Sequence, residues 1–194
     1  MKLLVCPSGF KGSISSSIAA DCIEEGILRV LPTAKIRKVP LADGGEGFAA
    51  TLTMATNGQI RQMTVTGPVG VPIRSSYGIL GGCRQKTAVI EIAAAAGLSL
   101  VPADSRNPCL TTSYGVGQLM AAALDEGVRR IIIGCGDSGT SDGGAGMLQA
   151  LGARLVDVTG KDIPAGSGGQ ALISLAHVDL SGTHSRLKNV QMEV

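Results

Sequence analysis

Short strand-like segments alternate with glycine-containing loops and helical segments along this chain. Residues 2–6, 35–39 and 129–134 are typical of strands, and the consecutive isoleucines of the last segment suit a strand buried on both faces of a parallel sheet. Apolar residues at helical spacing predict helices over 14–31 and roughly 48–56, with Ser13 as the N-cap of the first. This order predicts an α/β fold that begins with a mostly parallel sheet.

The middle of the chain shows a different pattern. Residues 59–92 contain three β-rich segments separated by glycine-containing turns, which predict an antiparallel meander. A helix capped within 111–113 is expected to run to about Asp125, before the strand at 129–134, so that this part forms a second βαβ unit. Further strands are predicted at 153–158 and 190–194, and a short helix at 168–177.

Composition narrows the class of protein. The 194 residues are 44% hydrophobic but only 2% aromatic, so the core must be built from aliphatic side chains. A net charge of +2 without a run of lysines or arginines argues against nucleic acid as a partner. The five cysteines are odd in number and lack C-x-x-C spacing, which indicates no disulfide framework or zinc site and favours the cytoplasm. The most apolar region is interrupted by polar residues, so no membrane span is predicted.

The segment 134–146 carries the strongest signal for chemistry. Six glycines alternate there with polar residues, namely Asp137, Ser138, Thr140, Ser141 and Asp142. A strand, a glycine-rich turn and a helix start can aim backbone N–H groups at an anion. The alternative is a tight connection that needs small residues. The glycines also match G-x-G-x-x-G, and Asp157 stands where a dinucleotide-binding acid is expected, but the acids inside the loop indicate instead a metal or a hydroxyl to be deprotonated.

Four other residues offer a choice between function and structure. Asp43 and Glu46 flank two glycines after a predicted strand, where they could hold Mg²⁺ or accept a proton, or cap the next helix. Lys11 precedes the first helix and is either a contact for phosphate or carboxylate or an ordinary solvated lysine. Glu91, at the end of a predicted strand, is either a paired core carboxylate or a site residue, and we favour the site.

Eight motifs occur in order along the chain. They are GFKGS (9–13), LADGGEG (41–47), VTGPVGVPI (65–73), AVIEIAAAAGL (88–98), RNP (106–108), TTSYGVGQL (111–119), DGGAGMLQALGA (142–153) and VDLSG (178–182). In this set the chain resembles the bacterial type I family of glycerate kinases along essentially its whole length. So many ordered motifs are far more specific than one glycine loop.

The resemblance implies phosphorylation of D-glycerate to phosphoglycerate with ATP and Mg²⁺, in a two-domain α/β fold with the active site in the cleft. One domain is discontinuous, and the other is Rossmann- or flavodoxin-like and inserted into it. Residues 1–90 would be the N-terminal part of the discontinuous domain, and 91–194 the first part of the inserted domain. Family members are considerably longer, so both domains are expected to be incomplete here, with self-association through exposed edges and no membrane partner.

The residues and the resemblance together suggest individual roles. The catalytic candidates are Lys11, Asp43 and Asp142: Lys11 would neutralise a carboxylate or a transferring phosphate, and Asp142 would act as an acid or base. Asp43 and Glu46 would hold Mg²⁺ or orient the substrate hydroxyl. Substrate or phosphate binding is expected of Ser13, Gly44, Gly45, Glu46, Asn107, Thr112, Gly136, Ser138, Thr140, Gly143 and Gly144.

Two loops depart from the family pattern. Ser8 and Gly9 stand where Asp and Ser are usual, and the loop GDSGTSDGG adds Asp137 and has Ser141 in place of Asn. The competing hypothesis is a non-catalytic module of the same fold that binds a nucleotide or anion without turnover. Because phosphoryl transfer needs donor, acceptor and metal held in line, we expect these 194 residues not to phosphorylate glycerate by themselves.

Overall fold

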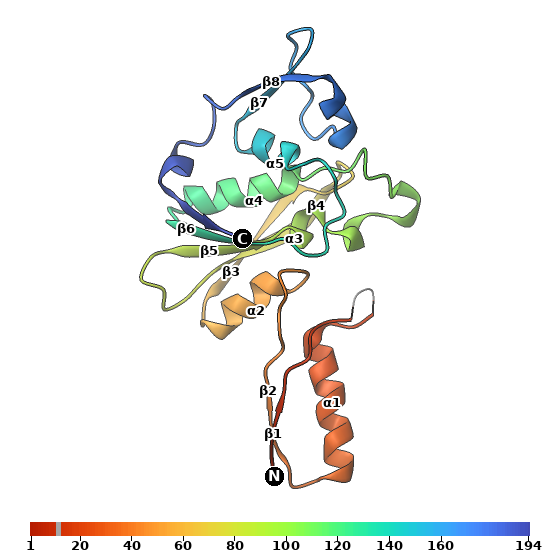
Figure 1. Cartoon of the computed structure of the whole chain (residues 1–194). Coiled ribbons are helices and arrows are strands. Elements are labelled where there is room, and N and C mark those ends of the chain that lie inside the picture. The colour runs from red at the N-terminus through yellow and green to blue at the C-terminus, as the bar shows by residue number, and fades with distance from the viewer. Residues whose placement is uncertain (11–12) are drawn as a thin grey trace. The chain divides into compact units, whose positions relative to one another are not determined.

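The computed structural model describes residues 1–10 and 13–194, and it divides into two compact units (Figure 1). The first unit is Met1–Asp43 and the second is Gly44–Val194. This division follows packing within the present chain. The domain boundary expected at 90/91 falls inside a strand of the second unit and stays a prediction.

The first unit is a two-stranded parallel sheet with one helix. Strand β1 (Lys2–Val5) pairs with β2 (Lys35–Lys38), and α1 (Ser16–Val30) connects them, as predicted. Lys38 joins the sheet to α1, because its Nζ lies 2.7 Å from Asp21 Oδ1 and 2.5 Å from Glu24 Oε2. The hydrogen bonds to Asp21 and Glu24 raise the pKa of Lys38 to about 12.

The expected N-cap of α1 was wrong by two residues. Ser15 caps the helix, and its Oγ accepts a hydrogen bond from Ile18 N at 3.3 Å. Ser13 lies in a turn, where its N–H donates to Phe10 O, and Ile14 also bonds to the Phe10 backbone. The chain therefore enters the helix only after this turn.

The second unit is built on a mixed five-stranded sheet with the order β3-β4-β5-β6-β9. The strands are β3 (Gln59–Thr66), β4 (Pro72–Ile79), β5 (Thr87–Glu91), β6 (Arg130–Gly134) and β9 (Gln191–Glu193). The first three are antiparallel, which confirms the predicted meander. Strands β5, β6 and β9 are parallel, so the carboxyl ends of β5 and β6 meet at one edge of the sheet.

Helices lie on both faces of this sheet (Figure 1). They are α2 (Phe48–Ala55), α3 (Ala93–Ala96), α4 (Tyr114–Asp125) and α5 (Ala145–Ala150). Helix α4 connects β5 to β6 as the predicted βαβ unit, and the aliphatic core between α4 and the sheet includes Ile90, Leu119 and Ile131, all fully buried. Side chains alternate along a strand. Ala88 and Ile90 thus face α4, whereas Glu91 faces α2.

The remaining segments form a small peripheral layer. Strand β7 (Arg154–Asp157) pairs antiparallel with β8 (Leu175–Asp179) outside the main sheet. The 3₁₀ helices are η1 (Leu98–Leu100), η2 (Ala103–Ser105), η3 (Gly169–Ser174) and η4 (Ser185–Asn189). The helix expected over 168–177 is thus only partly right, because pairing with β7 draws 175–177 into a strand. Within the described residues, no helix is long and apolar enough to cross a membrane.

Candidate functional site

Two glycine-rich loops touch at the carboxyl ends of β5 and β6. One is the Gly44–Gly47 loop before α2, and the other is the loop of residues 134–144 after β6. Gly136 N donates to Gly44 O at 2.9 Å, and Glu46 N donates to Asp137 Oδ2 at 3.2 Å. The structure therefore brings together four of the predicted binding residues, Gly44, Gly45, Glu46 and Gly136.

Glycines of the second loop serve two different purposes. A Cβ on Gly136 would lie 2.5 Å from Gly45 Cα, and a Cβ on Gly134 would lie 2.5 Å from Gly44 O. These two positions therefore need glycine for loop-to-loop packing. Gly143 and Gly144 differ, because their φ angles are +59° and +78°, and a Cβ would meet no atom within 4 Å at Gly143 and only Met147 Cε at 3.4 Å at Gly144. There the turn itself requires glycine.

Glu91 caps the start of α2 from the end of β5. Its Oε1 accepts from Gly47 N at 3.0 Å, and its Oε2 accepts from Ala49 N at 2.7 Å. The side chain is buried, with 7% exposure. Burial raises the pKa of Glu91; the two N–H groups oppose this rise, and the carboxylates of Glu46 and Asp137 add to it. The sequence favoured a site role for Glu91 over that of a paired core carboxylate, but it gave no sign of the cap on α2.

Asp142 joins the starts of α4 and α5. Its Oδ2 accepts from Ser113 N at 2.8 Å, Ser113 Oγ at 2.9 Å and Gly146 N at 3.1 Å, and its Oδ1 accepts from Gly144 N at 3.1 Å. Thr112 Oγ1 lies 3.4 Å from the same Oδ2. The side chain is 2% exposed. These contacts give Asp142 a clear structural role, and its part as an acid or base stays a prediction.

The start of α5 is already supplied with acceptors. Gly144 N and Gly146 N bond to Asp142, and Met147 N donates to Ser113 Oγ at 3.0 Å. A phosphate at residues 143–144 would have to use other donors or displace the carboxylate. The expected phosphate contact at Gly143 and Gly144 therefore stays a prediction that needs a direct test.

The other candidate residues are spread over both units. Lys11 lies outside the described residues, and Ser13 and Asp43 belong to the first unit. Asn107 is exposed, and its Oδ1 accepts from Cys109 N at 3.0 Å within its own loop. Ser138 forms an isolated backbone bridge with Gly97, and Thr140 follows half-buried. The roles of all these residues stay predictions.

The described residues give two observations that bear on the predicted metal site and on the dinucleotide-binding alternative. Among them, no group of three or more His, Cys, Asp or Glu residues is arranged to hold a metal. Asp43 and Glu46, the proposed Mg²⁺ ligands, belong to different units. Asp157 closes a turn by accepting from Thr159 N and Lys161 N, and its strand lies outside the main sheet. This placement disfavours the dinucleotide-binding alternative.

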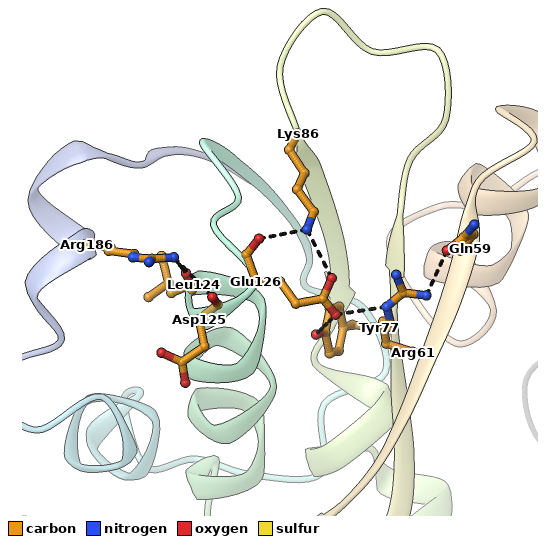
Figure 2. Close-up of polar contacts among 8 residues, drawn as sticks. All are labelled: Gln59, Arg61, Tyr77, Lys86, Leu124, Asp125, Glu126 and Arg186. Atoms are coloured by element: carbon orange, nitrogen blue, oxygen red, sulfur yellow. Dashed lines mark hydrogen bonds and ion pairs between the residues drawn. The ribbon is translucent and has the colours of Figure 1, made fainter.

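The opposite end of the sheet carries a cluster of charged side chains around Glu126 (Figure 2). Its Oε1 accepts from Arg61 Nε and Tyr77 Oη, both at 2.9 Å, and its Oε2 lies 3.1 Å from Lys86 Nζ. Arg186 also donates to the carbonyl of Leu124 at the end of α4. A pocket of about 430 Å³ lies at this end as well, lined by Cys83, Arg84, Gln85, Thr87, Arg130, Gln191 and Glu193. It is remote from the glycine loops along the strands.

The fold and the paired loops define an α/β protein with a candidate site at the carboxyl edge of its parallel strands. A model of the glycerate kinase family matches residues 3–194, and the chain belongs to this family. It is 55% identical to a glycerate kinase of Bacillus subtilis (strain 168) and 48% identical to a glycerate 2-kinase of Escherichia coli (strain K12), each over all of this chain and 50% of the relative.

A solved structure agrees with this assignment. The crystal structure of a putative glycerate kinase 2 from Salmonella typhimurium LT2 matches with a TM-score of 0.77 and 47% identity, over 99% of this chain and 51% of that one. The chain thus spans about half the length of the relatives it matches. The α/β fold inferred from the sequence is confirmed.

Proposed function

We propose that this chain takes part in the ATP-dependent phosphorylation of D-glycerate to phosphoglycerate. Membership of the glycerate kinase family carries the proposal. The geometry supports it, because two glycine-rich loops with acidic side chains are tied together where parallel strands end. Ligands of open α/β sheets bind outside the carboxyl ends of the strands, so this edge is the expected place for a substrate.

The proposed roles follow phosphoryl-transfer chemistry, which depends on positioning and charge stabilisation. Lys11 would neutralise the substrate carboxylate or a phosphate. Asp43 and Glu46 would orient the substrate hydroxyl or hold Mg²⁺, which would neutralise charge on the ATP phosphates. The loop at 136–144 would shape the phosphate site, and Asp142 would hold that loop against α4 through the contacts described above.

A binding and turnover experiment tests this function. Titration calorimetry measures binding of ATP–Mg²⁺ and, separately, of NAD, and so compares the kinase hypothesis with the dinucleotide-binding alternative. We expect a heat of binding with ATP–Mg²⁺ and none with NAD. A coupled assay with ATP and D-glycerate then measures turnover against the ordinary enzyme range of about 1–10³ s⁻¹. Binding of ATP–Mg²⁺ without turnover would support the non-catalytic alternative, and binding of neither nucleotide would contradict the proposal.

The proposal also includes the location of the protein and its partners. A cytoplasmic location, the lack of a nucleic-acid partner and self-association through exposed sheet edges stay predictions from composition and strand order. The edge strands of the five-stranded sheet are β3 and β9.

A further inference from the structure

We propose that Glu91 is a positioning residue, which holds the Gly44–Gly47 loop in register with the loop after β6. Its effect on catalysis rests on the proposed function, but its effect on loop order does not. The observation that carries the proposal is a buried carboxylate that bonds to two backbone N–H groups of a segment more than forty residues away in the chain, Gly47 and Ala49.

The placement of Glu91 follows from the sheet. All five residues of β5 are buried, and Glu91 is paired in register with Gly134 at the carboxyl end of β6. Its side chain faces α2, whereas its neighbour Ile90 packs in the core beneath α4. A rigid central strand therefore carries the carboxylate to the start of α2.

Helix α2 has no local substitute for this contact. Its N-cap is Gly47, which has no side chain, and its first turn contains no acidic residue. Phe48 N bonds to Gly45 O, so Glu91 serves the donors on either side of it. A helix of this length is marginal without such partners. The start of α2, and with it the adjacent loop, thus depends on Glu91.

The surroundings of Glu91 argue for more than an ordinary cap. Within the described part of the chain, its carboxylate bonds to backbone N–H groups and not to a cation, and the acids Glu46 and Asp137 lie close enough to disfavour its charge. A buried charge without a cation is costly. The Glu91 carboxylate nevertheless anchors the Gly44–Gly47 loop. The N–H of Glu46 in this loop donates to Asp137, so Glu91 acts on the candidate site through the backbone of Glu46.

The test compares Glu91→Gln with a matched change at the other end of α2. Glutamine keeps the size but offers only one acceptor atom, so one of the two N–H groups faces an amide NH₂. The control is Thr56→Val, because Thr56 Oγ1 donates to Leu52 O at 2.9 Å and accepts from Gly81 N at 3.2 Å, away from the loop. Both variants weaken α2, but only Glu91→Gln removes a hydrogen bond from the start of the helix.

Hydrogen exchange of the Gly47 and Ala49 amides is the direct readout. In Glu91→Gln we expect these amides to exchange at least about tenfold faster than in the parent, as befits loss of a charged acceptor, while Thr56→Val leaves them within about twofold. We also expect kcat/KM for glycerate to fall by about tenfold or more in Glu91→Gln beyond any fall in Thr56→Val. Equal exchange rates and equal kinetics in the two variants would overturn the proposal.

The test remains decisive if Glu91→Gln does not fold or if the parent chain shows no turnover. If Glu91→Gln does not fold, Glu91→Asp keeps the charge on a shorter side chain, and faster exchange at Gly47 and Ala49 in that variant supports the proposal, whereas parental rates overturn it. If the parent chain shows no turnover by itself, as expected from its sequence, the kinetic comparison falls away and the exchange measurement alone decides the role of Glu91.

Discussion

Glu91 and Glu126 lie at opposite ends of the five-stranded sheet, and each fixes one end of a helix. Glu91 holds the start of α2 through the backbone N–H groups of Gly47 and Ala49. Glu126 ends α4 and holds it to the neighbouring strands through side chains, those of Arg61 and Lys86 among them (Figure 2). One carboxylate is held by peptide dipoles, and the other by cations and a phenol.

The two environments shift the carboxyl groups in opposite directions. Burial raises the pKa of Glu91. Burial also acts to raise the pKa of Glu126, but hydrogen bonds from Tyr77, Lys86 and Arg61 outweigh it and leave that pKa below its ordinary value of 4.5. The charge of Glu126, at the amino ends of β5 and β6, is therefore stabilised by its neighbours. The charge of Glu91, at the carboxyl ends of these strands beside the glycine loops, is destabilised by its burial. Such costs are typical of functional sites.

The largest effect is expected from a substitution that adds a side-chain atom where the two glycine loops touch. In Gly136→Ala the new Cβ meets the Gly45 backbone at 2.5 Å, so the loops must separate, and we expect a loss of about 3 kcal/mol in the free energy of unfolding. Gly143→Ala meets no atom within 4 Å but keeps φ at +59°, which costs about 1 kcal/mol. Urea denaturation of both variants measures the difference, and equal midpoints would refute loop packing as the reason for Gly136.

A second change separates chemistry from stability. In a full-length form of the kinase, we expect Asp43→Asn to lower turnover by about 10²-fold or more with little change in the urea midpoint, since the residue lies in a loop. Glu126→Gln is the matched carboxylate-to-amide change at the other end of the sheet, and it should leave turnover unchanged. Near-normal turnover of Asp43→Asn at saturating Mg²⁺ would remove Asp43 from the candidate site.

The third prediction concerns pH. Because the folded pKa of Glu126 is lowered, its stabilising contribution is present above the ordinary value of 4.5 and is lost as pH falls through the folded pKa. We expect Glu126→Gln to be about 1 kcal/mol less stable than the parent at pH 7 and to match it in acid. For Glu91 the pH dependence of stability has the opposite sign. Because its folded pKa is raised, its contribution to the free energy of unfolding is lost as pH rises. A stability gap for Glu126→Gln that persists unchanged below about pH 4 would mean that the charge of Glu126 does not stabilise the fold.

The smallest effect is expected at the exposed edge of the Glu126 cluster. Lys86 is 41% exposed and bonds to the Glu126 carboxylate and to its backbone carbonyl. We expect Lys86→Ala to cost about 0.5 kcal/mol, and less in 1 M salt, because exposed ion pairs are weak and screened. A cost above about 2 kcal/mol would mean that Lys86, and not the Tyr77 and Arg61 contacts, holds this end of α4.

Local patterns predicted most of the strands and helices, because burial on one face imposes a period that is visible in the sequence. The meander over 59–92 and the βαβ unit through α4 are examples. The errors arose where backbone pairing outside the main pattern decided the outcome, once between distant segments and once locally. The segment 175–177 became a strand by pairing with β7, and the start of α1 was delayed by the turn between Phe10 and Ile14.

The candidate site was predictable only in part, for a related reason. The contact between the loops of Gly44 and Gly136 follows from the order of the strands, which the sequence suggests but does not determine. The donors to Asp142 at Ser113 lie 29 residues away, and those to Glu91 lie 42 and 44 residues away. No spacing rule reaches that far, so the sequence alone could favour a site role for Glu91 but could not identify the backbone groups that it binds.

The long-range cap on α2 has a consequence for the order of folding. An eight-residue helix nucleates poorly in isolation, and the carboxylate that completes its first turn reaches it only after β5 is in place. The hairpin of β3 and β4 needs no such partner, because its strands are adjacent in the chain. We therefore expect α2 to gain its native contacts after the folding transition state, with φ-values near zero for Glu91 and higher values in the hairpin. The loop that precedes α2 would then be among the first parts of the second unit to open again in native conditions.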